Sequence, residues 1–179
     1  MVVAGAVVTL IKTKRQPVRF YLLALLCSIL PDADVVGYHY FHIPSGHILG
    51  HRGFFHSPFF AILLGIFIGT LFFRREPIFT RGWFAYVLIF TLIAASHGLL
   101  DALTNGGNGI ALLSPFSSQR YFFPWTPIEV SPLGIQRFLG PRGISVMISE
   151  ILWIWIPLVG IFGSAEFIRM YFRKKYEFK

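Results

Sequence analysis

The sequence predicts an all-α integral membrane protein, a polytopic bundle of about four or five membrane helices with an ordered extracytoplasmic loop. Of its 179 residues, 55% are hydrophobic and only 13% are charged, against roughly 25% charged residues in soluble domains. Long apolar runs are separated by Pro, Gly and Arg, which is typical of consecutive membrane segments. Most of the Lys and Arg residues flank these runs, as in membrane proteins with a fixed orientation. We expect one domain over residues 1–179.

The apolar runs predict the individual helices. A short first helix is expected at residues 1–11, which lack the features of a cleaved signal peptide. The next helix, Phe20–Leu30, should stop at Pro31, because a proline ring disfavours helix in the residue before it. Ser57 and Pro58 are a favourable N-cap and first helical residue for a run through Phe73. The last two helices are expected at Trp83–Leu103 and at Ile144–Met170, the latter interrupted by Pro157.

The basic residues predict the orientation of these helices. Lys and Arg cluster at residues 12–19, 74–81 and 169–179, and such clusters remain in the cytoplasm. With all three clusters and the C-terminus inside, residues 31–56 and the Gly- and Pro-rich loop 104–143 meet on the extracytoplasmic side. The net charge of +8 therefore indicates anchoring to the lipid bilayer, and no nucleic-acid partner is expected. The lone Cys27 excludes an intramolecular disulfide and a thiolate metal cluster.

Three short polar motifs fall on the predicted outer side. Leu30–Asp34 holds two carboxylates after the proline, where an extended backbone would point both to the same side. Gly50–Ser57 supplies two imidazoles around an arginine, and Ser96–Asp101 places an imidazole and a carboxylate four residues apart on one helix face. Mixed imidazole and carboxylate ligands suit zinc, and also manganese or iron. The candidate ligands, sufficient for one or two divalent ions, are Asp32, Asp34, His51, His56, His97 and Asp101.

Each motif also has a purely structural interpretation. The Pro-Asp-x-Asp sequence is common in capping turns, and the histidines of the second motif suit a membrane interface. The His-x-x-x-Asp pair would serve as a buried polar couple, although ionisable groups at membrane depth are costly and usually functional. The joint presence of three motifs on one side favours a metal site. By contrast, His39, His42 and His47 lie among aromatic residues and are interpreted as part of an interfacial belt.

Together the motifs Leu-Pro-Asp-x-Asp, Gly-His-Arg-Gly-x-x-His-Ser and Ser-His-x-x-x-Asp resemble the YdjM-like, or DUF457, family of inner-membrane metal-dependent hydrolases. The likeness runs from about Leu30 to the last helix. It implies a multi-pass protein of the bacterial inner membrane with a hydrolase site on the six candidate ligands. Family members usually carry Thr-His or Gly-His before the first apolar run, whereas this chain opens with Met1–Gly5. We therefore expect either one ligand fewer or a truncated start.

The expected chemistry is metal-assisted hydrolysis of a phosphoester or phospholipid, in which the ion activates a water molecule and polarises the ester. We assign catalytic roles to Asp34, His56 and Arg52, with Arg52 neutralising charge that builds up on the substrate. Ser57 and Ser96 are candidates for orienting the ligand histidines, and Ser57 also suits a helix cap. Two alternatives are a transporter and a non-catalytic metal-binding membrane protein, and the sequence leaves the oligomeric state open. Basic residues that would bind an anionic substrate, or equally lipid headgroups, are Arg120, Arg137 and Arg142.

Overall fold

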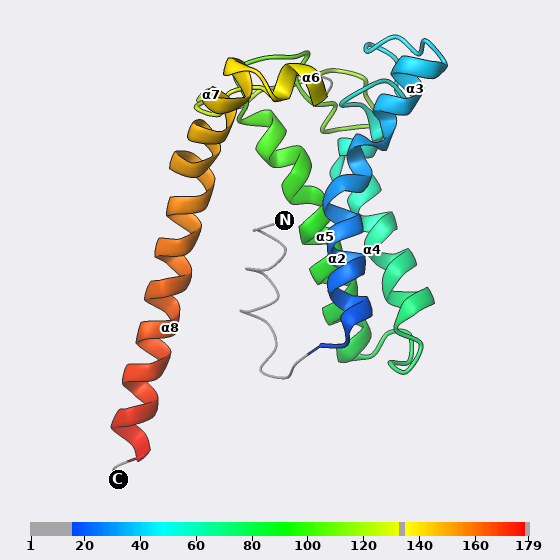
Figure 1. Cartoon of the computed structure of the whole chain (residues 1–179). Helices are drawn as coiled ribbons and strands as arrows, with labels where there is room; N and C mark the ends of the chain where they lie inside the picture. Colours follow the sequence, from blue (N-terminus) through cyan, green and yellow to red (C-terminus); the bar gives the residue numbers. More distant parts are fainter. Residues whose placement is uncertain (1–15, 133–134, 178–179) are drawn as a thin grey trace. The chain divides into compact units, whose positions relative to one another are not determined.

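The computed structural model describes residues 16–132 and 135–177, and the regular secondary structure in these ranges is helical apart from isolated β-bridge residues (Figure 1). The helix predicted at residues 1–11 lies outside the described residues. The described chain forms two compact units that divide after Thr126, and each is treated by itself. Helices long and apolar enough to cross a membrane span Val18–Tyr40, Arg81–Ala102 and Pro141–Ala165, with a shorter apolar helix at Pro58–Phe72. The all-α membrane fold is therefore confirmed.

The first unit is built on α2 (Val18–Ile29), α4 (Pro58–Phe72) and α5 (Arg81–Ala102), with α5 packed against both of the others. Two glycines allow α4 and α5 to approach closely. A Cβ atom on Gly65 would lie 2.6 Å from the Val87 carbonyl oxygen, and one on Gly69 would lie 2.8 Å from the Val87 side chain. Small residues four apart serve this purpose in membrane bundles, where close backbone packing replaces the hydrophobic effect.

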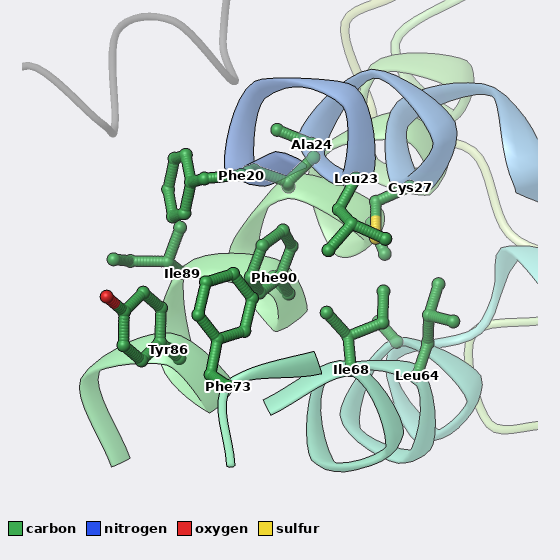
Figure 2. Packing of buried hydrophobic residues seen from close by; sticks show 13 residues of the cluster. Phe20, Leu23, Ala24, Cys27, Leu64, Ile68, Phe73, Tyr86, Ile89 and Phe90 are labelled. Carbon is green, nitrogen blue, oxygen red and sulfur yellow. The ribbon is translucent and has the colours of Figure 1, made fainter. Parts of the chain in front are cut away.

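Apolar side chains fill the space between these three helices (Figure 2). Phe20 is fully buried and makes ring contacts with Phe73 and Phe90. Large apolar residues also cover the outward faces, for example Leu22 on α2 and Phe67 on α4. Exposed apolar residues over whole helix faces are what a lipid environment requires.

The backbone at Pro31 differs from the prediction. The helix does not give way to an extended segment. It tightens into a 3₁₀ turn, η1 (Leu30–Ala33), and continues as α3 (Asp34–Tyr40). Pro31 occupies the start of the 3₁₀ turn, where its fixed φ suits a helix and its missing N–H group is not needed. The prediction of an extended backbone was wrong, and the two aspartates differ in burial: the side chain of Asp32 is 52% exposed and that of Asp34 is fully buried.

The predicted start of α4 is confirmed by its cap, whereas α5 begins at Arg81, two residues before the predicted Trp83, with Thr80 as a cap that was not predicted. The Ser57 hydroxyl accepts a hydrogen bond from the Phe60 N–H at 3.1 Å, and the Thr80 hydroxyl accepts one from the Trp83 N–H at 3.3 Å. As a result, α4 runs away from the second polar motif and α5 returns to the level of the third. The basic cluster at residues 74–81 joins α4 to α5 at the opposite end of the bundle (Figure 1).

The loop after α5 is ordered, as predicted. Within the first unit, Ile110 and Tyr121 exchange two backbone hydrogen bonds of 2.9 Å and form an isolated β-bridge. The Ala111 N–H donates to the Arg52 carbonyl at 3.1 Å, and the Phe123 N–H donates to the Ala102 carbonyl at 2.9 Å. These bonds tie the loop to the second polar motif and to the end of α5.

The second unit contains α6 (Ile135–Phe138), α7 (Pro141–Glu150), a π-helical turn at Ile151–Trp155 and α8 (Ile156–Glu177). The predicted interruption takes the form of this π-helical turn just ahead of Pro157. A proline inside a helix removes one backbone hydrogen bond and clashes with the preceding turn, and a π-helical turn accommodates such a defect without ending the helix.

Candidate metal site

His56 lies at the centre of the polar cluster, at the end of the 3₁₀ turn η2 (Phe54–His56). His56 is only 2% exposed. Its ring packs edge-on against the rings of His51 and His97 at centroid distances of 5.6 and 5.1 Å. The ring nitrogens of His56 face the carboxylates of the other two motifs. The three predicted motifs therefore meet in one place.

Both nitrogens of this buried imidazole lie near carboxylate oxygens without a well-formed hydrogen bond to any described residue. The Nδ1 atom lies 3.1 Å from Asp34 Oδ2, and the Nε2 atom lies 3.3 Å from Asp101 Oδ2 and 3.6 Å from Asp32 Oδ1. Buried polar atoms are normally satisfied. A divalent cation placed between an imidazole nitrogen and two carboxylates would be bound by all three groups.

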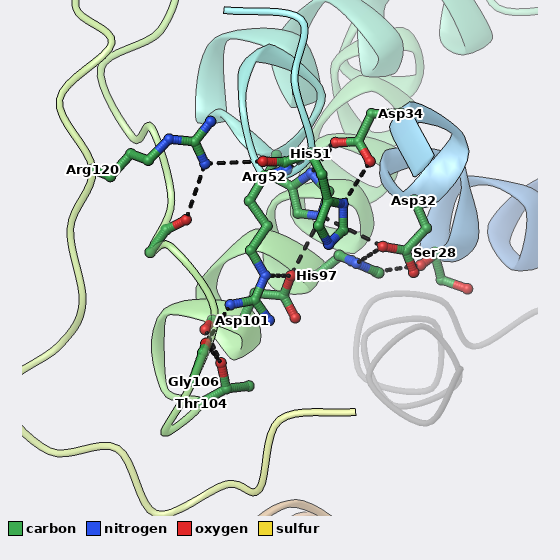
Figure 3. A network of polar contacts seen from close by, with 12 residues as sticks. Ser28, Asp32, Asp34, His51, Arg52, His97, Asp101, Thr104, Gly106 and Arg120 are labelled. Atoms are coloured by element: carbon green, nitrogen blue, oxygen red, sulfur yellow. Dashed lines mark hydrogen bonds and ion pairs between the residues drawn. The ribbon is translucent and has the colours of Figure 1, made fainter. Parts of the chain in front are cut away.

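Asp34 is fully engaged by protein groups. Its Oδ1 atom accepts a hydrogen bond of 2.8 Å from the Nδ1 of His51, and its Oδ2 atom accepts one of 3.0 Å from the backbone N–H of Arg52 (Figure 3). The same Oδ2 faces Nδ1 of His56. A carboxylate that holds the Nδ1 side of two imidazoles fixes their orientation and leaves both Nε2 atoms for other partners.

His97 is oriented by the backbone. Its Nδ1–H donates to the Ser28 carbonyl at 2.8 Å, because a carbonyl oxygen only accepts, and its Nε2 lies 3.3 Å from Asp32 Oδ1 (Figure 3). Ser28 precedes the 3₁₀ turn on α2, so this bond also fixes α5 against α2. Sequence reasoning missed this contact, because a backbone carbonyl leaves no signature in the sequence.

Glycines in the motifs allow the backbone to close around the site. A Cβ atom on Gly98 would lie 2.3 Å from the carbonyl oxygen of His56, so α5 packs directly against the backbone of that residue. A Cβ atom on Gly53 would lie 2.3 Å from the Ile48 carbonyl. At these positions glycine is required for close approach, which explains why the histidine motifs contain it.

Arg52 is buried beside the imidazoles, with a left-handed φ of 63°. Its Nε lies 3.2 Å from Asp101 Oδ2, and its Nη1 donates to the Gly106 carbonyl at 2.8 Å (Figure 3). Gly107, with φ of 86°, lies against the guanidinium, since a Cβ atom there would come within 2.6 Å of Nη1. The arginine is thus held in one position by the loop and by α5.

Arg120 has a positioning role that the sequence did not reveal. Its guanidinium donates to the backbone carbonyls of His51 at 2.9 Å, Gly109 at 3.4 Å and Ser45. Burial lowers the pKa of Arg120, partly offset by Asp34, while Arg52 lowers it further. Through its two Nη atoms, the residue joins the loop that carries His51 to the segment after α5. An arginine in a Gly-rich loop carries no sequence signal for this role.

The carboxylates dominate the electrostatics of the site. Burial lowers the pKa of His56, but the close carboxylates of Asp101, Asp32 and Asp34 outweigh burial and raise it from 6.5 to about 10. The cluster therefore favours positive charge at the centre of the site. A proton on His56 and a metal ion would compete for this position.

The donor set fits a divalent metal ion. Two groups of three residues each place one ligand atom per residue within 4.8 Å of the other two, and these groups are Asp32, His51 and His56, and His56, His97 and Asp101. They contain five of the six candidate ligands. Asp34 belongs to neither group, and its occupied oxygens favour an orienting role.

The predicted supporting residues are arranged differently from the prediction. The Ser57 hydroxyl donates to the Phe54 carbonyl at 2.7 Å and caps α4, and the Ser96 hydroxyl donates to the Ile93 carbonyl at 2.7 Å. Neither hydroxyl contacts a histidine ring in these bonds, because each lies within reach of a carbonyl three residues before it. Arg137 and Arg142 belong to the second unit, where Arg142 lies 3.9 Å from Glu129.

Comparison with known proteins places the chain in a family. It is 41% identical over 154 residues to the inner membrane protein YbcI of Escherichia coli K12, which covers 84% of this chain and 85% of that protein. No solved structure matches the chain. The model of the family described as YdjM inner membrane protein matches residues 1–174, and the chain, with its polar motifs gathered at one end of an apolar bundle, belongs to the YdjM inner membrane protein family.

Proposed function

We propose that this chain is a metal-dependent hydrolase that acts on a phosphoester at the extracytoplasmic face of the inner membrane, with phospholipids as the first substrates to test. The observation that carries the proposal is His56, a buried imidazole whose two nitrogens lack well-formed hydrogen bonds and lie among three carboxylates. Such a group is costly in an apolar bundle unless a cation completes its surroundings.

The chain's own residues divide into ligands and supports. His51, His56 and His97 would present Nε2, and Asp32 and Asp101 would each present a carboxylate oxygen to the ion. Asp34 would orient His51 and His56, which replaces the ligand role expected from the sequence. A divalent ion held in this way, zinc or alternatively manganese or iron, would supply an activated water molecule and polarise the ester.

Arg52 is suited to bind the anionic part of a substrate. Its Nε and Nη1 bind Asp101 and the Gly106 carbonyl, which fixes the plane of the guanidinium. A fixed guanidinium beside the ligands would stabilise negative charge on the phosphoryl oxygens as the ester bond breaks. We retain Arg137 and Arg142 as proposed contacts for the substrate or for lipid headgroups.

The proposed orientation of the protein in the membrane is supported by the positions of the candidate ligands and of the basic residues at opposite ends of the first unit. The candidate ligands lie where α2 ends and α4 begins, and the arginines of residues 74–81 lie at the far end of α4. With that end in the cytoplasm, the site faces outward near the level of the headgroups. Location and charge together favour a phospholipid or another membrane-borne phosphoester.

A non-catalytic metal site is the principal alternative, because an ion at this position would also hold α2, α5 and the segment that carries His51 and His56 together. A transporter is less well supported. The interior of the described bundle below the site is lined by the apolar side chains of α2, α4 and α5, whereas a substrate path would need polar groups across the membrane.

The test is turnover with matched variants. The protein would be purified in detergent, loaded with Zn²⁺ or Mn²⁺, and assayed for release of phosphate or headgroup from phosphoesters and phospholipids. His56→Ala and Asp34→Ala are expected to abolish activity, and His39→Ala, at an exposed histidine of α3, is expected to preserve it. Activity that survives both site substitutions would exclude the catalytic assignment. Tight metal binding with no turnover on any substrate would favour the non-catalytic alternative.

A further inference from the structure

The number of ions that the polar cluster can hold follows from the directions of its donor atoms, provided that the cluster is the metal site proposed above. We infer that the site takes one divalent cation per chain and that the Arg52 guanidinium takes the place of a second cation.

His56 limits the number of ions. It belongs to both groups of candidate ligand atoms, but its Nδ1 faces Asp34, so only Nε2 points toward the other carboxylates. A neutral imidazole offers one lone pair, which binds one ion. Two ions could not both bind His56, so one of them would retain only a histidine and an aspartate.

Two protein ligands are fewer than the three that catalytic zinc sites usually supply. Asp34 does not make up the difference, because its Oδ1 accepts from His51 and its Oδ2 accepts from the Arg52 backbone. Ser57 and Ser96 bond backbone carbonyls in their own segments. Among the described residues, the donors around the cluster suffice for one well-coordinated ion.

Arg52 occupies the position where a second cation would balance Asp101. Its Nε lies 3.2 Å from Asp101 Oδ2, and the same oxygen lies 3.3 Å from Nε2 of His56. One carboxylate oxygen thus lies between the guanidinium and the imidazole that would hold the ion. The Gly106 carbonyl and the close approach of Gly107 keep the guanidinium there.

The charges agree with a single ion. Three carboxylates, those of Asp32, Asp34 and Asp101, surround the site, and one divalent ion together with Arg52 neutralises them. Arg120 adds a further positive charge at the carbonyl of His51. A second divalent ion would leave this largely buried site with a large excess of positive charge, which is unfavourable away from water.

The test is metal stoichiometry, with Mn²⁺ as the probe. Protein in detergent would be stripped with chelator, reloaded with Mn²⁺, freed of excess metal by gel filtration and analysed by elemental analysis and electron paramagnetic resonance. The expected result is one Mn²⁺ per chain with the spectrum of an isolated ion. Two ions per chain, or the spectrum of an exchange-coupled pair, would overturn the inference and leave the proposed hydrolase standing. Absence of bound metal would overturn both.

Variants at Arg52 test the second half of the inference. Arg52→Lys keeps a cation and should still bind one Mn²⁺, whereas Arg52→Met and Arg52→Gln remove it and should admit a second, weakly held ion on the two remaining ligands at high metal concentration. Arg75→Met, at an exposed arginine beyond the far end of α4, is the control and should retain one ion. If either neutral variant elutes as folded protein and still binds a single ion, the guanidinium does not replace a second cation. The wild-type stoichiometry decides the number of ions even if both variants fail to fold.

Discussion

Gly98 offers a direct test of how the fold builds the site. It follows His97 on α5, and a Cβ atom added to it would lie 2.3 Å from the carbonyl oxygen of His56. Real Cβ atoms essentially never come within 3.0 Å of a heavy atom that belongs to a residue distant in the chain. In Gly98→Ala the two backbones must therefore separate by about 0.7 Å, and neither atom belongs to a flexible side chain that would yield instead.

The expected magnitude follows from this displacement. Overpacking of a well-packed interface costs about 1–3 kcal/mol of stability. Metal sites require their ligands within roughly 0.5 Å of the productive geometry, so a shift of His56 relative to His97 should reduce metal affinity by about 10- to 100-fold. Both effects arise from one methyl group whose nearest neighbours would be backbone atoms of His56.

The assay is metal binding and thermal unfolding of purified variants in detergent. Gly160→Ala is the matched control, since a Cβ atom on that helical glycine of α8 would meet nothing within 4 Å, and alanine should stabilise the helix slightly. Gly65→Ala is a second control that distinguishes a loss of stability from a change in site geometry. It disturbs the packing of α4 against Val87 on α5 and does not alter a contact of the ligands. If Gly98→Ala binds metal as tightly as Gly160→Ala, the argument that α5 positions His56 through this contact is wrong.

Three further predictions concern the cation and its surroundings. Removal of metal by chelation should lower the thermal midpoint, and saturation at a hundred times the dissociation constant should restore about 2.7 kcal/mol; an unchanged midpoint would contradict a metal that joins the helices. Asp34→Asn should weaken metal binding by about 10- to 100-fold through loss of histidine orientation, as measured by competition with a chromophoric chelator, whereas Glu76→Gln near the start of α5 should not. Because the metal-free site raises the pKa of His56 to about 10, this proton must leave before Nε2 binds an ion, so metal affinity should rise about tenfold per pH unit from about pH 6 to 9. A flat or falling affinity over that range, with His39→Ala as control, would contradict competition between a proton and the metal ion at His56.

The sequence by itself determined the class of protein and the convergence of its motifs. Composition and the length of the apolar runs predicted membrane helices, because the bilayer fixes how many apolar residues a span needs. Ser57 and Pro58 predicted the start of α4, since capping depends on residues close in sequence. His97 and Asp101 fall on one helix by spacing alone, and alternation of the helices carried all three motifs to the same end.

Only the tertiary structure decided what each polar residue does there. Asp32 and Asp34 are two residues apart in one motif, yet the helical turn at Pro31 exposes the first and buries the second among His51, the Arg52 backbone and His56. The carbonyl of Ser28 and the absence of a side chain at Gly98 position His97 and His56. Such roles depend on backbone atoms and close contacts between segments distant in the chain, which residue types and local spacing do not encode.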